Sequence, residues 1–122
     1  MSNTVINPAH YPTQLAEKTG RLTELLRPFS APRLAIFSSP VSHYRMRAEF
    51  KFWHEGDDCF YVMTDRSGNR VRTDQFPVAC HKINQLMPAL IVLLQSNEIL
   101  RRKLFQVDFL AATTEEAVIT LT

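Results

Sequence analysis

The 122-residue chain has only three glycines, and they are scattered at Gly20, Gly56 and Gly68. A phosphate-binding P-loop and the G-x-G-x-x-G fingerprint of dinucleotide-binding folds both need clustered glycines, so neither motif is present. The chain also shows no strand-helix-strand pattern of the Rossmann type. The sequence therefore offers no recognisable binding site for a nucleotide cofactor.

Cysteine is equally scarce: Cys59 and Cys80 are the only two, and they do not form a C-x-x-C pair. The four histidines do not stand at metal-ligand spacing with them, so we expect no zinc site. We expect free, buried thiols, although the spacing leaves a disulfide open. The apolar neighbours of Cys80 favour a structural thiol, and Asp57-Asp58 fall in a turn, so we expect no catalytic residue in this chain.

Long apolar runs and an excess of one charge are missing as well. No run approaches membrane-spanning length, and the N-terminus lacks the basic and apolar regions of a signal peptide. Lys and Arg number 14 against 12 Asp and Glu, and 45% of the residues are hydrophobic, which is a globular composition. We therefore expect one soluble, cytoplasmic unit, in which any nucleic-acid binding depends on local basic clusters.

The clearest pattern is the alternation from Arg45 to His54, which predicts a strand with one buried face. The face expected to be buried carries Met46, Ala48, Phe50, Phe52 and His54. The opposite face carries three cations, an acid and an aromatic residue: Arg45, Arg47, Lys51, Glu49 and Trp53. Such a face can meet phosphates and stack on bases. The polar side of an antiparallel sheet is usually only solvated, so the pattern alone leaves both interpretations open.

Further strands are predicted on both sides of this one. Residues 59–64 and 70–73 would extend it into a three-stranded meander. Residues 104–110 and 117–122 would form a C-terminal hairpin, and the short apolar run 34–37 would add an edge strand. The strand pattern continues up to Thr122, as it can in a natural domain and as it would in a piece of a longer protein, and an exposed strand edge would allow self-association.

Two helices complete the predicted fold. An apolar stripe from Thr13 to Pro28 predicts the first, which Gly20 weakens. A period of three to four residues predicts the second, from Pro77 to about Gln95, with a kink or break at Pro88. The sequence thus predicts an α+β fold: an antiparallel sheet, made of a meander plus a C-terminal hairpin, packed with an N-terminal helix and a Pro-kinked second helix.

The basic run Arg101-Arg102-Lys103 is a second candidate for nucleic-acid contact. It could clamp phosphates while Phe105 stacks on an unpaired base. It could equally be a solvated loop beside a helix C-terminus, where cations are favoured. The alternation places Phe105 on the same face as Val107 and Phe109, so the pattern by itself favours core packing for Phe105.

Five stretches of the chain carry a resemblance to a known family: Gln14 to Lys18, Ser39 to Phe50, Phe76-Pro77, Ile83 to Met87, and Lys103 to Gln106. In their order and spacing they resemble the N-terminal part of the bacterial tRNA (uracil-5-)-methyltransferases, and the resemblance spans nearly the whole chain. It implies an enzyme that transfers a methyl group from S-adenosylmethionine to C5 of the T-loop uridine of tRNA and of tmRNA, producing 5-methyluridine (ribothymidine). That chemistry uses a cysteine nucleophile and a base.

In the family these catalytic groups and the cofactor site belong to a C-terminal Rossmann-like domain that the 122 residues do not include. Neither Cys59 nor Cys80 stands in a context like that of the family nucleophile. The resemblance therefore implies that this fragment binds no cofactor, is inactive by itself, and contributes recognition of the tRNA T-arm. We expect the parent enzyme to be a monomer without metal or membrane partners.

The resemblance also assigns roles to particular residues. Arg45, Arg47 and Lys51 would contact the RNA backbone, and Phe105 would contact loop bases. For Phe105 the resemblance thus favours an RNA contact, whereas the alternation favours core packing. Arg101, Arg102 and Lys103 are further candidate RNA contacts. At position 51 the family also uses Arg, and Lys keeps the charge but lacks the bidentate fork. The alternative function is a non-enzymatic α+β module that binds a protein partner through its basic face or an exposed strand edge.

Overall fold

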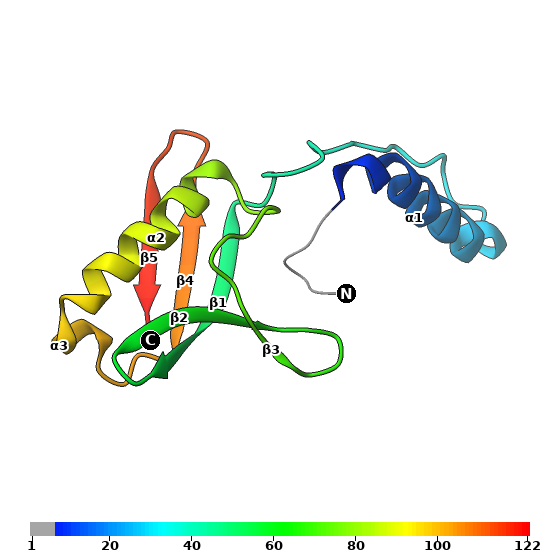
Figure 1. The fold of residues 1–122 in the computed structure, drawn as a ribbon. Coiled ribbons are helices and arrows are strands. Elements are labelled where there is room, and N and C mark those ends of the chain that lie inside the picture. The colour runs from blue at the N-terminus through cyan, green and yellow to red at the C-terminus, as the bar shows by residue number, and fades with distance from the viewer. Residues whose placement is uncertain (1–6) are drawn as a thin grey trace. The chain divides into compact units, whose positions relative to one another are not determined.

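The computed structural model describes residues 7–122 of the chain (Figure 1). Its contacts divide this stretch into two compact units, Asn7–Val41 and Ser42–Thr122. Each unit has its own elements and its own hydrogen bonds. The candidate functional residues all lie in the second unit.

The unit Asn7–Val41 is built around helix α1, Tyr11–Leu26, between two short 3₁₀ turns, Pro8–His10 and Arg27–Phe29. The predicted N-terminal helix is therefore confirmed, and it begins two residues before Thr13. None of its residues is buried, and Leu25 is 68% exposed. The edge strand expected over 34–37 is wrong, because those residues have no strand partner in the structure.

The unit Ser42–Thr122 contains a five-stranded antiparallel sheet with the strand order β3-β2-β1-β4-β5. The strands are β1 Arg47–Glu55, β2 Asp58–Thr64, β3 Arg70–Arg72, β4 Gln106–Ala111 and β5 Ala117–Leu121. The predicted meander and C-terminal hairpin are both present. Strand β4 pairs with β1, and this pairing joins the hairpin to the meander.

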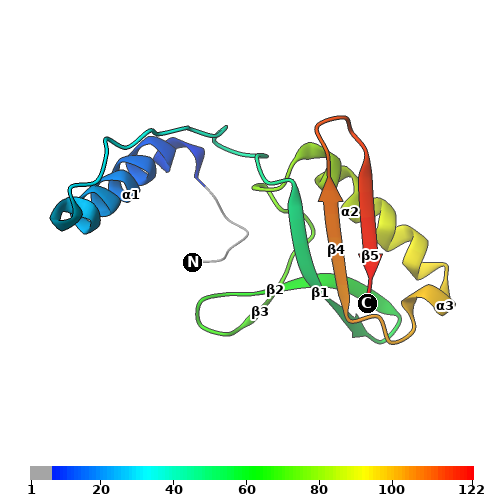
Figure 2. The ribbon, with the colours of Figure 1, turned by 180° about the vertical axis from the view of Figure 1, so that it is seen from behind.

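Helices α2, His81–Gln95, and α3, Glu98–Arg101, connect β3 to β4. Figures 1 and 2 show from opposite sides that α2 crosses one face of the sheet, while no helix of this unit covers the other face. Pro77 does not start the helix as predicted; it lies in the turn before it, and α2 begins after Cys80. The expected break at Pro88 is also absent, because α2 runs through Pro88 as one helix. Pro88 faces solvent, and its missing N–H leaves the Asn84 carbonyl without its helical donor.

The core lies between α2 and the covered face of the sheet. It is centred on Phe50, Tyr61 and Phe109, whose rings lie 5.3 to 5.9 Å apart, and α2 contributes the fully buried Ile83 and Met87. Burying each of these side chains stabilises the fold by about 1.5 to 3 kcal/mol. The predicted buried face of β1 is confirmed for Ala48, Phe50 and Phe52, which are at most 4% exposed. His54, expected on that face, is exposed.

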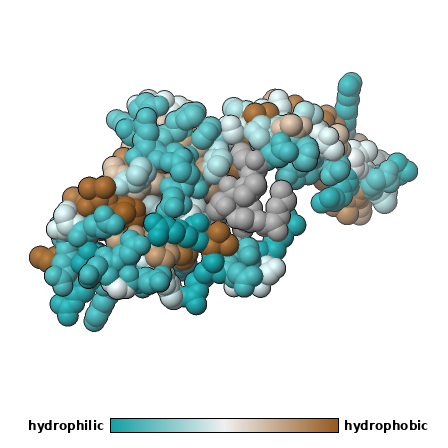
Figure 3. Space-filling model, in the orientation of Figure 1, coloured by the Kyte–Doolittle hydropathy of each residue, from teal (hydrophilic) through white to brown (hydrophobic). Residues whose placement is uncertain are grey.

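Hydrophobic side chains also reach the surface on the helical side of this unit. Figure 3 shows them over the C-terminal half of α2 and over α3, where Val92, Leu93 and Ile99 are exposed. Within residues 7–122, none of the helices has the length and apolar character needed to cross a membrane.

Candidate nucleic-acid interface

The face of the sheet that α2 does not cover, called the open face below, carries the polar side of β1 as predicted. Arg47, Glu49, Lys51 and Trp53 alternate with the buried residues of that strand and are all exposed. They project from the same face as Phe60 of β2 and Arg72 of β3, because the cross-strand register pairs Trp53 with Phe60 and Val62 with Arg72. Residues from three strands therefore form one surface.

Arg45 lies just before β1 rather than inside it, so the predicted strand starts two residues too early. Its backbone is held by the loop before α2: its N–H donates to the Val78 carbonyl at 2.8 Å, and its carbonyl accepts from the Cys80 N–H at 2.8 Å. Its guanidinium lies 6.0 Å from the centre of the Phe76 ring. The loop before α2 thus fixes the backbone position of Arg45, the first predicted cation.

The other two predicted cations of β1 have different neighbours. Arg47 forms an exposed ion pair with Glu49, which offsets part of its charge. Lys51 donates a hydrogen bond to the side chain of Gln106 at 3.0 Å, and its ammonium lies 4.8 Å from the centre of the Phe105 ring. Lys51 and Phe105, far apart in the sequence, are therefore brought together by the pairing of β1 with β4.

Phe105 is half exposed, at 51%, so the core packing that the alternation favoured is wrong. Strand β4 begins only at Gln106, and Lys103 has a positive φ of 59° that turns the chain before it. The backbone of Phe105 still joins the sheet: its carbonyl accepts from the Phe52 N–H and its own N–H donates to the Thr122 carbonyl, both at 2.8 Å. An anchored backbone therefore presents a ring that remains accessible.

Within the basic run Arg101-Arg102-Lys103, one residue lies as expected for a loop beside a helix C-terminus. Arg101 donates from Nη1 to the carbonyl of Gln95 at 3.0 Å, at the C-terminal end of α2, where a cation is favoured. Arg102 and Lys103 are exposed. Only these two residues of the run have side chains without a hydrogen bond or ion pair in the described part of the chain.

Two cation–aromatic contacts on the open face involve arginines that were not among the predicted site residues. The guanidinium of Arg70 lies 3.8 Å from the centre of the Trp53 ring, and that of Arg72 lies 4.6 Å from the centre of the Phe60 ring. The sequence signal was present in the alternating pair Arg70 and Arg72, which a strand directs to one face. Which aromatic ring each arginine meets depends on the twist and pairing of three strands.

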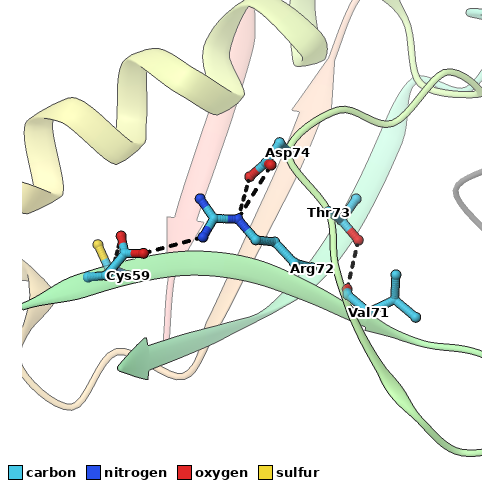
Figure 4. A network of polar contacts seen from close by, with 6 residues as sticks. Cys59, Val71, Arg72, Thr73 and Asp74 are labelled. Atoms are coloured by element: carbon cyan, nitrogen blue, oxygen red, sulfur yellow. Dashed lines mark hydrogen bonds and ion pairs between the residues drawn. The ribbon is translucent and has the colours of Figure 1, made fainter. Parts of the chain in front are cut away.

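Arg72 is engaged by two carboxylates, as Figure 4 shows for Asp74. Its Nε lies 3.0 Å from the Asp74 carboxylate, and its Nη1 lies 3.3 Å from the Asp58 carboxylate. The hydrogen bond to Asp74 is the main cause that raises the pKa of Arg72 above its ordinary value. Asp58 also accepts the N–H of Cys59, so one member of the Asp57-Asp58 pair has a structural role.

Two surface hollows are lined in part by the three predicted cations Arg45, Arg47 and Lys51. One, of about 440 Å³, is lined in part by Arg45, Arg47 and Phe76. The other, of about 200 Å³, is lined in part by Lys51, Val62 and Gln106. Val62 belongs to the open face by its register with Lys51 and Arg72, and it is only 4% exposed. The arrangement offers separate cations and aromatic rings to an elongated anion.

The two cysteine thiols are not exposed on the open face. Cys59 and Cys80 are free and buried, and burial is the main cause that raises the pKa of the Cys59 thiol. Within the part of the chain that the structure describes, no three His, Cys, Asp or Glu side chains are grouped so that they could hold a metal ion. The groups brought together on the open face suit binding: cations for phosphates and rings for stacking.

Fold and site together define an α+β protein whose antiparallel sheet has one face covered by a helix and one open face lined with cations and aromatic rings. The model of the family tRNA (Uracil-5-)-methyltransferase matches residues 10–122. The chain belongs to this family, which confirms the resemblance found in the sequence.

Individual relatives agree with the family assignment. A tRNA/tmRNA (uracil-C(5))-methyltransferase of Vibrio parahaemolyticus is 49% identical over 122 residues, covering 99% of this chain and 33% of the relative. The enzyme of the same name from Musicola paradisiaca is 54% identical over 112 residues, covering 91% of this chain and 30% of the relative. The chain therefore spans about a third of the length of the curated relatives it matches.

Proposed function

We propose that this chain is the N-terminal RNA-recognition portion of a tRNA/tmRNA (uracil-C5)-methyltransferase and that it holds the T-arm of the substrate RNA. The observation that carries this proposal is the contact between Lys51 and Phe105 on the open face. The pair sets a cation beside a half-exposed ring, and this is the combination that binds a phosphate and stacks on the adjoining base.

The other predicted cations extend this contact along the RNA. Arg45 and Arg47 line a hollow at the start of β1, the strand that also carries Lys51, and would meet successive phosphates. Arg102 and Lys103 stand just before Phe105 in the chain and would add charge near the stacked base. Arg101 is committed to the end of α2 and would contribute less.

The parent enzyme would transfer the methyl group of S-adenosylmethionine to C5 of the T-loop uridine, in a domain that these 122 residues do not contain. Residues 1–122 would supply binding and no catalytic group or cofactor contact. The parent would act as a monomer in the cytoplasm, where tRNA and tmRNA are found. The names of the relatives support the reaction proposed for the parent, and the share of their length that the chain covers supports a separate catalytic domain.

The test is binding of the 122-residue chain to a T-arm hairpin RNA, compared with an anticodon-arm hairpin of the same length. We expect weak binding that favours the T-arm. Lys51→Ala should weaken binding about 3- to 10-fold, and Phe105→Leu by a larger factor, because stacking on a base is worth about 1 to 3 kcal/mol.

Matched controls come from other surfaces. Lys82→Ala removes one charge from helix α2. Phe37→Leu removes an aromatic ring whose residue is 90% exposed in the other unit. Equal affinity for the two hairpins, or losses in the site variants no larger than in these controls, would contradict the proposal.

A further inference from the structure

The Arg70–Trp53 contact links strands that do not pair with each other. Strand β2 lies between β3 and β1, yet the guanidinium of Arg70 reaches to 3.8 Å from the centre of the Trp53 ring. Trp53 remains 40% exposed. A planar guanidinium held against an indole keeps its N–H groups, which point outward in its plane, free to form hydrogen bonds.

The charge of Arg70 also remains available. Its neighbour Arg72 is engaged by Asp58 and Asp74, whereas Arg70 has no ion pair among the residues that the structure describes. The carboxylates of Asp58 and Asp74 are therefore already bound to Arg72. An incoming anion at Arg70 would not compete with either of them.

The segment that leads into Arg70 is ordered by its own hydrogen bonds. The carboxylate of Asp65 accepts the N–H groups of Ser67 and Asn69, both at 2.9 Å, and the N–H of Asp65 donates to the Asn69 carbonyl at 2.9 Å. The bonds from Asn69 are the leading cause that lowers the pKa of Asp65. A closed turn and a stacked side chain together reduce the conformational entropy that Arg70 loses on binding a ligand.

We propose that Arg70, stacked on Trp53, is a second RNA contact that binds backbone phosphates of the helical stem next to the T-loop. The inference rests on the proposed T-arm recognition and extends it from the Lys51 and Phe105 contact to the β3 edge of the same open face. A phosphate fits this position better than a base, since Arg70 already covers the Trp53 ring. The outward N–H groups of the guanidinium match the oxygens of a phosphate.

The experiment uses the 122-residue chain and two hairpin RNAs with the same T-loop, one with the full stem and one with a shortened stem. Trp53 is the only tryptophan of the chain, so its emission reports directly on the stack. Arg70→Ala should change the emission of the free protein. It should weaken binding of the full-stem RNA about 3- to 10-fold and make the slope of log K against log salt shallower by about one.

Two further variants make the result specific. Arg66→Ala removes an exposed charge four residues away, in the turn, and should have a smaller effect on affinity. Arg70→Lys keeps the charge but loses the planar stack, so it should retain the salt slope and lose part of the affinity. Circular dichroism identifies any variant that does not fold.

The inference is overturned if Arg70→Ala weakens binding no more than Arg66→Ala, or if it weakens binding of the shortened-stem RNA equally. Failure of the underlying proposal has a different signature, in which Lys51→Ala and Phe105→Leu leave the affinity for both RNAs unchanged. The two outcomes are therefore distinguishable within one set of titrations.

Discussion

The side-chain amide of Asn84 is hydrogen-bonded to both backbone groups of Phe76. Its Oδ1 accepts the Phe76 N–H at 2.8 Å, and its Nδ2 donates to the Phe76 carbonyl at 2.9 Å. The same Nδ2 lies 3.1 and 3.2 Å from the carbonyls of Ala79 and Cys80. Asn84 is a buried polar residue of the core, and it ties the first turns of α2 to the loop that also holds the backbone of Arg45.

Replacing Asn84 with Ala should therefore lower the free energy of unfolding by about 2 to 4 kcal/mol, because buried backbone groups lose their partners. Urea denaturation followed by circular dichroism measures this change. Gln85→Ala, at the exposed neighbouring position, should alter stability by no more than about 0.5 kcal/mol. Similar stabilities for the two variants would show that the Asn84 bonds are not stabilising.

Tyr61 contributes a second buried polar contact, since its hydroxyl donates to the Met87 carbonyl at 2.7 Å. Tyr61→Phe should cost about 1 to 2 kcal/mol at neutral pH. Burial is the main cause that raises the pKa of Tyr61 well above its ordinary value of 10.0.

The raised pKa makes the stability contributed by Tyr61 depend on pH. Above pH 10 the unfolded phenol loses its proton while the folded one keeps it, so the contribution falls as the pH rises. The difference in stability between wild type and Tyr61→Phe should shrink above that pH, as measured by urea denaturation. A constant difference up to pH 11 would contradict this assignment.

The two thiols should be unreactive in the folded protein. Cys59 is 1% exposed with a raised pKa, and Cys80 is 9% exposed. A thiol reagent such as Ellman's reagent should label neither cysteine in native buffer and both after unfolding, because thiolate formation and access are both suppressed. Rapid labelling of one thiol in the native state would show that its burial is not maintained in solution.

The sequence was sufficient to predict the parts of the fold that depend on regular periodicity. The alternation along β1 identified Ala48, Phe50 and Phe52 as buried residues, and the helical period identified α2 up to Gln95. Local breaks in the pattern were harder to predict. The positive φ of Lys103 changes the direction of the chain, so that Phe105 leaves the core face on which strict alternation would place it.

The candidate site was predicted only in part, for a physical reason. Arg45, Arg47 and Lys51 lie in one alternating stretch of the sequence and could be grouped from sequence alone. The contacts of Lys51 with Phe105 and of Arg70 with Trp53 each join residues far apart in the sequence, and they depend on strand order and twist. Asn84 was also missed as a structural residue, since a polar residue in an amphipathic helix shows no sign of the loop it binds.

Position 51 offers a test by gain of affinity. Lys51→Arg should keep the contact with the Phe105 ring and add a planar fork for phosphate oxygens. We expect binding of the T-arm hairpin to tighten about 2- to 5-fold, whereas Lys51→Met, which keeps the aliphatic length without the charge, should weaken it. Equal affinities for the Arg, Lys and Met forms would remove Lys51 from the interface.

The central claim, that the cations of the open face hold RNA phosphates, is tested most directly by the salt dependence of T-arm binding. Three phosphate contacts by Arg45, Arg47 and Lys51 predict a contribution of about −2 to −3 to the slope of log K against log salt. Replacing these three residues together with Ala should make the slope shallower by that amount, leaving the contribution of the remaining cations such as Arg70. The same loss of charge on α1 and the turn after it, through Lys18, Arg21 and Arg27, should leave the slope unchanged. An unaltered slope in the first variant, or an equal change in both, would contradict the account.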